Sequence, residues 1–161
     1  MILKSRSQKL LTLGYKLFIV LFIVSTVCAP LCACGLSDWD YDLPNGYYVA
    51  RGNYKRIFLA YGNGNGLGTT ITPKDKYVSY FAYNEVYIVA QTITLPEEIE
   101  PDEIEPFLKH AKVAYYIVNS ETQEVYEELT EEEYETLISE LQITNLCDWI
   151  PTITKPKGAW T

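Results

Sequence analysis

Residues 17–35 constrain this chain more than any other stretch, because they decide which residues are left to fold. Residues 17–24 are wholly apolar, and the first acidic residue is Asp38. Four basic residues precede the apolar run: Lys4, Arg6, Lys9 and Lys16. Basic residues followed by a short apolar core are typical of a secretory signal peptide. We therefore expect the rest of the chain to lie outside the cytoplasm.

The end of this stretch indicates which enzyme would cleave it. An ordinary signal peptidase requires small residues at the first and third positions before the cut. A cut after Ala33 would place Leu31 at the third position, and a cut after Ala29 would leave Pro30 as the first mature residue. The cleavage box Leu31-Cys32-Ala33-Cys34 instead resembles a bacterial lipobox. We expect cleavage before Cys34 and lipidation of Cys34.

An uncleaved membrane helix is the alternative interpretation. The 17 residues from position 17 to 33 lie at the short end of the roughly 17–25 residues that span a bilayer. Pro30 would also disturb the last turn of such a helix. The lipid anchor is therefore preferred, in the cell membrane or the outer membrane. The expected organisation is a signal peptide at 1–33, a tether at 34–45 and a single domain at 46–161.

The charge of the mature chain limits its partners. After removal of the leader, 9 Lys and Arg remain against 21 Asp and Glu. Nucleic acid and anionic lipid surfaces require a positive face, so neither is expected as a partner. The predicted partners are the membrane, through the lipid, and an envelope protein or a glycan.

Cysteine and acidic residues indicate no metal site. Cys28 and Cys32 leave with the leader and Cys34 carries the lipid, so Cys147 is the remaining thiol, with too few ligands for structural zinc. Its apolar neighbours predict that Cys147 is buried. The acidic, proline-rich segment 96–112 lacks a calcium-loop pattern and is expected to be a solvated connector with at most one helical turn. No metal and no cofactor are predicted.

Runs of β-branched and aromatic residues predict an antiparallel sheet. One hairpin is expected from 46–51 and 54–61, a second from 76–82 and 86–95, and a further strand at 113–119. Both faces of 86–95 are apolar, which is typical of a central strand. The glycine-rich segment 62–68 lacks the Lys-Ser/Thr pair of a phosphate loop and is expected to be a mobile connection between strands.

A helix is predicted at 131–142. Thr130 and Glu133 form a capping box, and four apolar residues follow at helical spacing: Tyr134, Leu137, Ile138 and Leu141. The predicted fold is α+β, with a mainly antiparallel sheet of about four to six strands and this C-terminal amphipathic helix packed on one face. Beyond it, residues 145–161 are expected to form an extended tail that packs through Trp149 and Ile150.

The sequence favours binding over catalysis. His110 is the only histidine, it lies in the acidic connector, and no serine has a G-x-S-x-G context. We therefore predict no catalytic residue and no enzyme activity. The 14 tyrosines and three tryptophans could form a binding surface for a glycan, peptide or partner protein, or be half-buried strand residues. A noncatalytic binding or envelope-structural domain is expected; the alternative is a small extracytoplasmic hydrolase with an acidic active site.

Several stretches carry a family resemblance. They are the lipobox; DLPNGYY at 42–48; YVSYFAYN at 77–84, followed by YIVA at 87–90; and YYIVN at 115–119, followed by the helix start at 129–132. Together they resemble a family of small bacterial lipoproteins known as domain of unknown function family 3997. The resemblance covers about 42–141 and implies an anchored bacterial protein. It supplies no activity and no catalytic residue.

Overall fold

The structure is a computed structural model that describes residues 38–62 and 68–160. The predicted signal peptide, residues 34–37 of the predicted tether and most of the glycine-rich segment lie outside the described residues. Within the described part, the fold consists mostly of antiparallel β-structure in two sheets of four and five strands. The prediction of a single sheet was therefore wrong. Strand propensity indicates which residues form strands, but it does not decide how the hairpins divide between sheets.

The first sheet contains β1 (Trp39–Asp42), β2 (Tyr47–Asn53), β3 (Arg56–Tyr61) and β4 (Thr69–Thr70), in that order. The predicted first hairpin is confirmed, because β2 and β3 pair in antiparallel register from Tyr47↔Tyr61. A short 3₁₀ turn, η1 (Pro44–Gly46), connects β1 to β2. Asn45 and Gly46 both adopt positive φ there, 57° and 81°, a conformation that Asn and Gly tolerate best.

The predicted tether requires a correction. Residues 39–42 are not a free linker, because they form the edge strand β1 and pair with β2 from Trp39↔Arg51 to Asp42↔Tyr48. Trp39 and Leu43 are both buried. The segment is mostly polar in composition, but Trp39 and Leu43 give it an apolar side that is buried in the fold. The ordered structure therefore begins before position 46.

The second sheet has the order β8-β7-β6-β5-β9. Its strands are β5 (Lys76–Tyr83), β6 (Tyr87–Thr94), β7 (Val113–Asn119), β8 (Val125–Leu129) and β9 (Ile150–Pro151). The predicted second hairpin is confirmed as β5 and β6. The central position of β6 is also confirmed: Ile88 and Ala90 enter the main core, whereas Val89 enters a smaller core on the other face.

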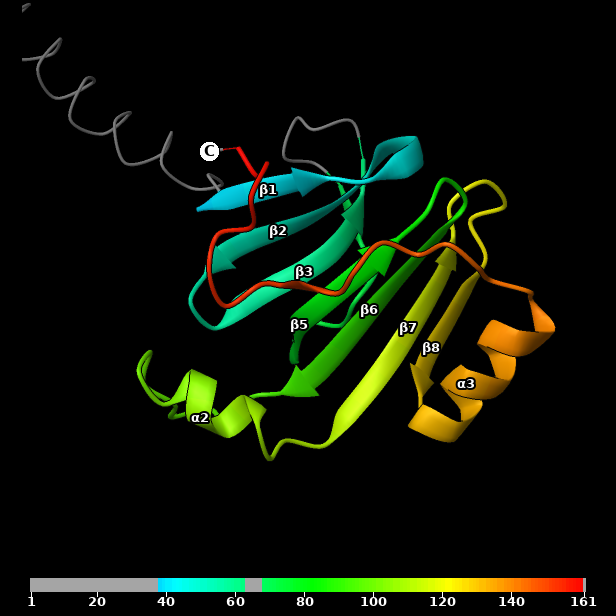
Figure 1. Ribbon diagram of the computed structural model, residues 1–161. Helices are drawn as coiled ribbons and strands as arrows, with labels where there is room; N and C mark the ends of the chain where they lie inside the picture. Colours follow the sequence, from blue (N-terminus) through cyan, green and yellow to red (C-terminus); the bar gives the residue numbers. More distant parts are fainter. Residues whose placement is uncertain (1–37, 63–67, 161) are drawn as a thin grey trace, which may run out of the picture. The chain divides into compact units, whose positions relative to one another are not determined.

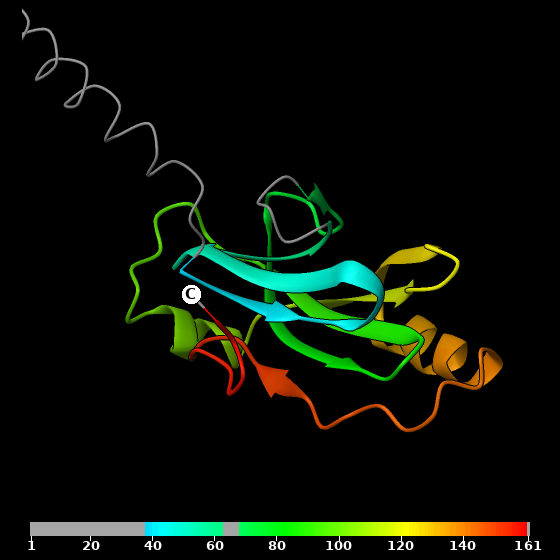
Figure 2. The same ribbon diagram turned by 90° about the horizontal axis from the view of Figure 1, so that it is seen from above.

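The two sheets share the main core. It joins Val49, Ile57 and Leu59 of the first sheet to Phe81, Ile88 and Tyr116 of the second. Figures 1 and 2 show β1–β3 lying over β5 and β6, with the short helix α2 (Ile104–Leu108) at one end. Ile104 and Ile99 of the acidic connector are buried in the same core. The connector is thus anchored by its isoleucines while its carboxylates face solvent.

Helix α3 (Glu131–Glu140) packs on β7 and β8, as Figure 1 shows. The capping box is confirmed: the Thr130 hydroxyl accepts from the Glu133 N–H, and the Glu133 carboxylate accepts from the Thr130 N–H. The predicted apolar stripe packs against Val89, Ile117 and Ile143, although its residues are only half-buried. The helix is not the C-terminal element, because the chain continues to β9 and back to β1.

The tail after α3 is held along its length. Ile150 and Pro151 pair with Phe81 and Tyr80 of β5, and the buried Thr152 hydroxyl donates to the Val78 carbonyl at 2.6 Å. The tail ends in a bridge between Trp160 and Asp40. The expectation for Trp149 was only partly correct, since 41% of its surface is exposed.

Candidate functional site

The predicted lipidation site and cleavage box, Leu31, Cys32, Ala33 and Cys34, lie outside the described residues, so the anchor stays a prediction. Cys147 is half-buried rather than buried. Its sulfur accepts a hydrogen bond from the Tyr83 N–H at 3.3 Å, and its own N–H donates to the Tyr83 carbonyl. These bonds fasten the tail to β5. His110 is exposed and does not line either of the cavities described below.

A groove with a volume of about 460 Å³ lies where four strands and a helix meet. The first residue of β5, the last residues of β6 and β8, the first residues of β7 and one side chain of α2 form its walls. Apolar side chains from three of these elements contribute: Phe107, Val113 and Leu129. Three charged side chains join them: Lys76, Lys112 and Glu128. An apolar cavity with a few convergent polar groups is typical of a ligand-binding site.

Glu128 is the centre of the polar contacts in the groove. Its Oε1 lies 3.3 Å from Lys76 Nζ and 3.4 Å from the Tyr116 hydroxyl, which donates to it. Lys76 Nζ also donates to Thr94 Oγ1 at 3.3 Å. Burial raises the pKa of Tyr116 above its ordinary value, and the neighbouring Glu128 and Glu127 charges raise it further. Tyr116 therefore stays protonated at neutral pH and remains a hydrogen-bond donor to Glu128.

The backbone of β8 directs Glu128 toward these partners. Glu128 adopts φ = 52°, which is unfavourable for a residue with a Cβ. The register between β7 and β8 shifts between Tyr115 and Ile117, opposite this position. A shift of this kind bends a strand and reorients a side chain, and such distortions concentrate at functional sites. The strained backbone and the groove thus coincide at one residue.

Lys112 is the second cation of the groove and, unlike Lys76, is not neutralised by Glu128. Its side chain is exposed immediately before β7, and within the described residues no ion pair to it is found. Lys76, by contrast, is largely covered and already neutralised by Glu128. The lining of the groove therefore combines a cation without an ion pair among the described residues, a carboxylate and apolar side chains. Sequence reasoning missed these residues, because they meet only through strand pairing and carry no local motif.

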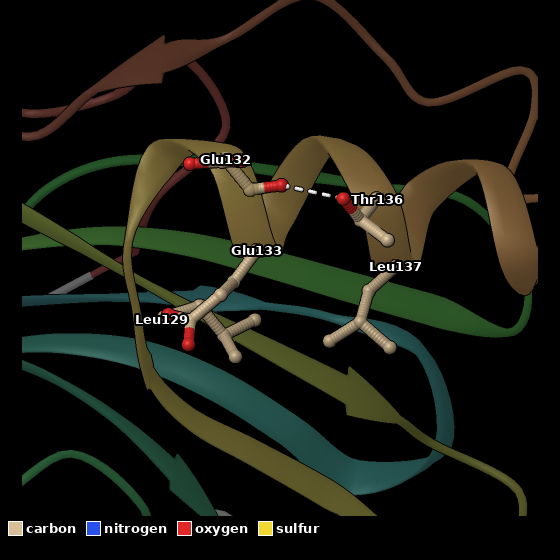
Figure 3. Close-up of a pocket in the computed structure, with 5 residues that line it drawn as sticks. All are labelled: Leu129, Glu132, Glu133, Thr136 and Leu137. Atoms are coloured by element: carbon tan, nitrogen blue, oxygen red, sulfur yellow. Dashed lines mark hydrogen bonds between the residues drawn. The ribbon is translucent and has the colours of Figure 1, made fainter.

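A second, shallower cavity of about 340 Å³ lies beside the first turns of α3. Figure 3 shows Leu129 of β8 and Leu137 of α3 directed into it, with Glu133 nearby. Two of its polar side chains are already paired: the Thr136 hydroxyl donates to the Glu132 carbonyl, and Glu133 completes the capping box. The backbone hydrogen bond from Thr130 lowers the pKa of Glu133. The helix start thus accounts for these groups without a ligand.

Three aromatic residues gather on the side of the second sheet that carries α3. Tyr115 and Tyr134 stack with ring centroids 4.4 Å apart, and Trp149 lies 6.5 Å from each. Gln91 donates to the Tyr115 hydroxyl at 3.4 Å. Tyr115 is nearly buried, so the stack mainly fastens α3 and the tail to the sheet. Trp149 is the exposed member.

Two negative observations apply to residues 38–62 and 68–160. No group of three or more His, Cys, Asp or Glu side chains in these ranges is arranged to hold a metal ion. No helix there is long and apolar enough to cross a membrane.

Comparison with known proteins gives a family but no activity. No curated protein and no solved structure matches the chain. One family model matches residues 44–149, which is more than half of the chain and includes both hairpins and α3. The chain belongs to the family described as "Protein of unknown function (DUF3997)".

Proposed function

We propose that this protein is a membrane-anchored bacterial lipoprotein whose folded part binds an envelope ligand without catalysis. The lipobox Leu31–Cys34 supports the anchor. The groove supports binding: it joins an apolar surface to Lys112, which has no ion pair among the described residues, and to the oriented carboxylate of Glu128. That single groove is the observation on which the binding proposal depends.

The chemistry of the groove favours a peptide segment of an envelope protein over a glycan. Phe107 is the one aromatic side chain among the described residues that line the groove, and it is half-buried, so the groove offers little aromatic surface on which a sugar ring could stack. Val113 and Leu129 suit an apolar side chain, whereas Lys112 suits an acidic one. An acidic-apolar segment would therefore satisfy both parts of the groove.

Hydrolysis by an acidic active site is less well supported. Both common glycosidase mechanisms use two carboxylates facing one bond. Glu128 is the one carboxylate among the described residues that line the groove, and it already accepts from Tyr116 and contacts Lys76. A structural role for Glu128 in shaping the groove accounts for these contacts.

The binding proposal is tested by an affinity pull-down with the full-length, detergent-extracted protein from its own cell envelope. Lys112→Glu reverses the charge at the groove and should remove the captured partner. Lys157→Glu makes the same change at an exposed position on the tail and should leave capture unchanged. Equal capture by wild type and both variants would place the partner elsewhere and contradict the groove.

A further inference from the structure

The two ends of the described domain meet at β1. The Asp40 N–H donates to the Trp160 carbonyl at 2.9 Å, and the Trp160 N–H donates to the Asp40 carbonyl at 2.9 Å. The Trp160 indole Nε1 also donates to Asp42 Oδ2 at 3.1 Å. Trp160 therefore lies along β1, which is an edge strand of the first sheet. With 44% of its surface exposed, it is the most exposed large apolar residue among those that the structure describes.

The predicted anchor is close to this edge in sequence. Asp38, at the start of the described domain, is four positions after Cys34. Even fully extended, four residues span only about 14 Å. A domain of about 100 residues has a radius of gyration of roughly 13 Å. A lipid on Cys34 would therefore hold β1 close to the bilayer and prevent the domain from presenting its far side.

The far side is the one that carries α3. Figures 1 and 2 place the start of β1 and the C-terminal end of the chain at one end of the domain and α3 at the other. Trp149 belongs to the α3 end, since it lies 6.5 Å from Tyr134 of that helix. The two exposed tryptophans thus mark opposite ends of the domain with nearly equal exposure, 41% and 44%.

We propose that the β1 edge with Trp160 is the face held against the lipid headgroups, with the Trp160 indole in the headgroup layer. This orientation rests on the proposed lipid anchor. Tryptophan is suited to that layer because its ring is apolar and its N–H is polar. Among the described residues, strand β1 offers no positive charge that would attract anionic lipid. Arg51 is paired with Asp38, and Asp40 and Asp42 lie on β1 itself. Zwitterionic lipid should therefore suffice.

The test uses the full-length lipidated protein in phosphatidylcholine vesicles with brominated acyl chains, which quench nearby tryptophan fluorescence. Trp149→Phe retains Trp160, and Trp160→Phe retains Trp149. The double variant records the contribution of the buried Trp39, which both single variants share. We expect brominated lipid to quench the Trp160 contribution and to leave the Trp149 contribution unchanged.

The outcomes separate this orientation from the anchor on which it depends. Flotation of the vesicles shows whether the protein is attached. If the protein floats but Trp160 is quenched no more than Trp149, the orientation is wrong while the anchor stands. If the protein does not float, the anchor fails, and the orientation fails with it.

Discussion

Tyr41 and Tyr83 connect the two sheets through their hydroxyl groups. Their oxygens lie 3.1 Å apart, and Tyr41 also packs edge-on against Phe81 with ring centroids 5.0 Å apart. Two effects raise the pKa of Tyr41 from 10.0 to about 12: the hydrogen bond to Tyr83, which is the larger, and burial. This pair depends on β1, which sequence analysis placed in a linker. Its partners are 42 residues apart, and no local pattern predicts such a contact.

The raised pKa of Tyr41 makes stability depend on pH. Because the folded value lies above the unfolded value, the stabilisation is complete below about pH 10 and is lost as the pH rises toward 12. Tyr83→Phe removes the hydrogen bond and should move the Tyr41 pKa toward 10. NMR titration of labelled tyrosine ring carbons measures this shift, with Tyr61→Phe as the control. An unchanged Tyr41 pKa in Tyr83→Phe would contradict the assigned cause.

At the scale of elements, the success of prediction depended on how local each signal was. Helix α3 and the two hairpins were predicted because caps, helical spacing and strand-turn-strand patterns all lie within a few residues of each other. The short strands β1 and β9 were missed, since each forms only by pairing with residues far along the chain. The groove was missed for the same reason. Its five elements lie between positions 76 and 130 and meet only in the folded sheet.

Helix α3 offers an internal comparison between two threonines. Thr130→Ala removes the cap and should lower the free energy of unfolding by about 0.5–2 kcal/mol. Thr136→Ala removes only a bond to the Glu132 carbonyl within the exposed helix surface, and a change of less than about 0.5 kcal/mol is expected. Urea unfolding monitored by circular dichroism measures both. Equal effects of the two substitutions would show that the capping box does not stabilise the helix.

At the scale of the whole molecule, the runs of β-branched and aromatic residues predicted a single domain rich in β-structure, but not its division into two sheets with a shared core. The proposed arrangement has three parts in sequence: a lipid on Cys34, the β1 edge beside it, and the groove of Lys112 and Glu128. The first part determines where the other two act. If Cys34 carries no lipid, the proposed orientation loses its physical basis, whereas the binding proposal still depends on the groove alone.

The most direct measurement of the central claim is therefore the fate of Cys34→Ser. In membranes of the native bacterium, wild-type protein should appear as a processed, lipidated form that begins at Cys34, identified by intact mass. Cys34→Ser should accumulate as the unprocessed precursor of 18.4 kDa, since the nucleophilic sulfur that accepts the lipid is gone. A Cys34→Ser protein that is processed and retained in the membrane like wild type would contradict the lipoprotein assignment.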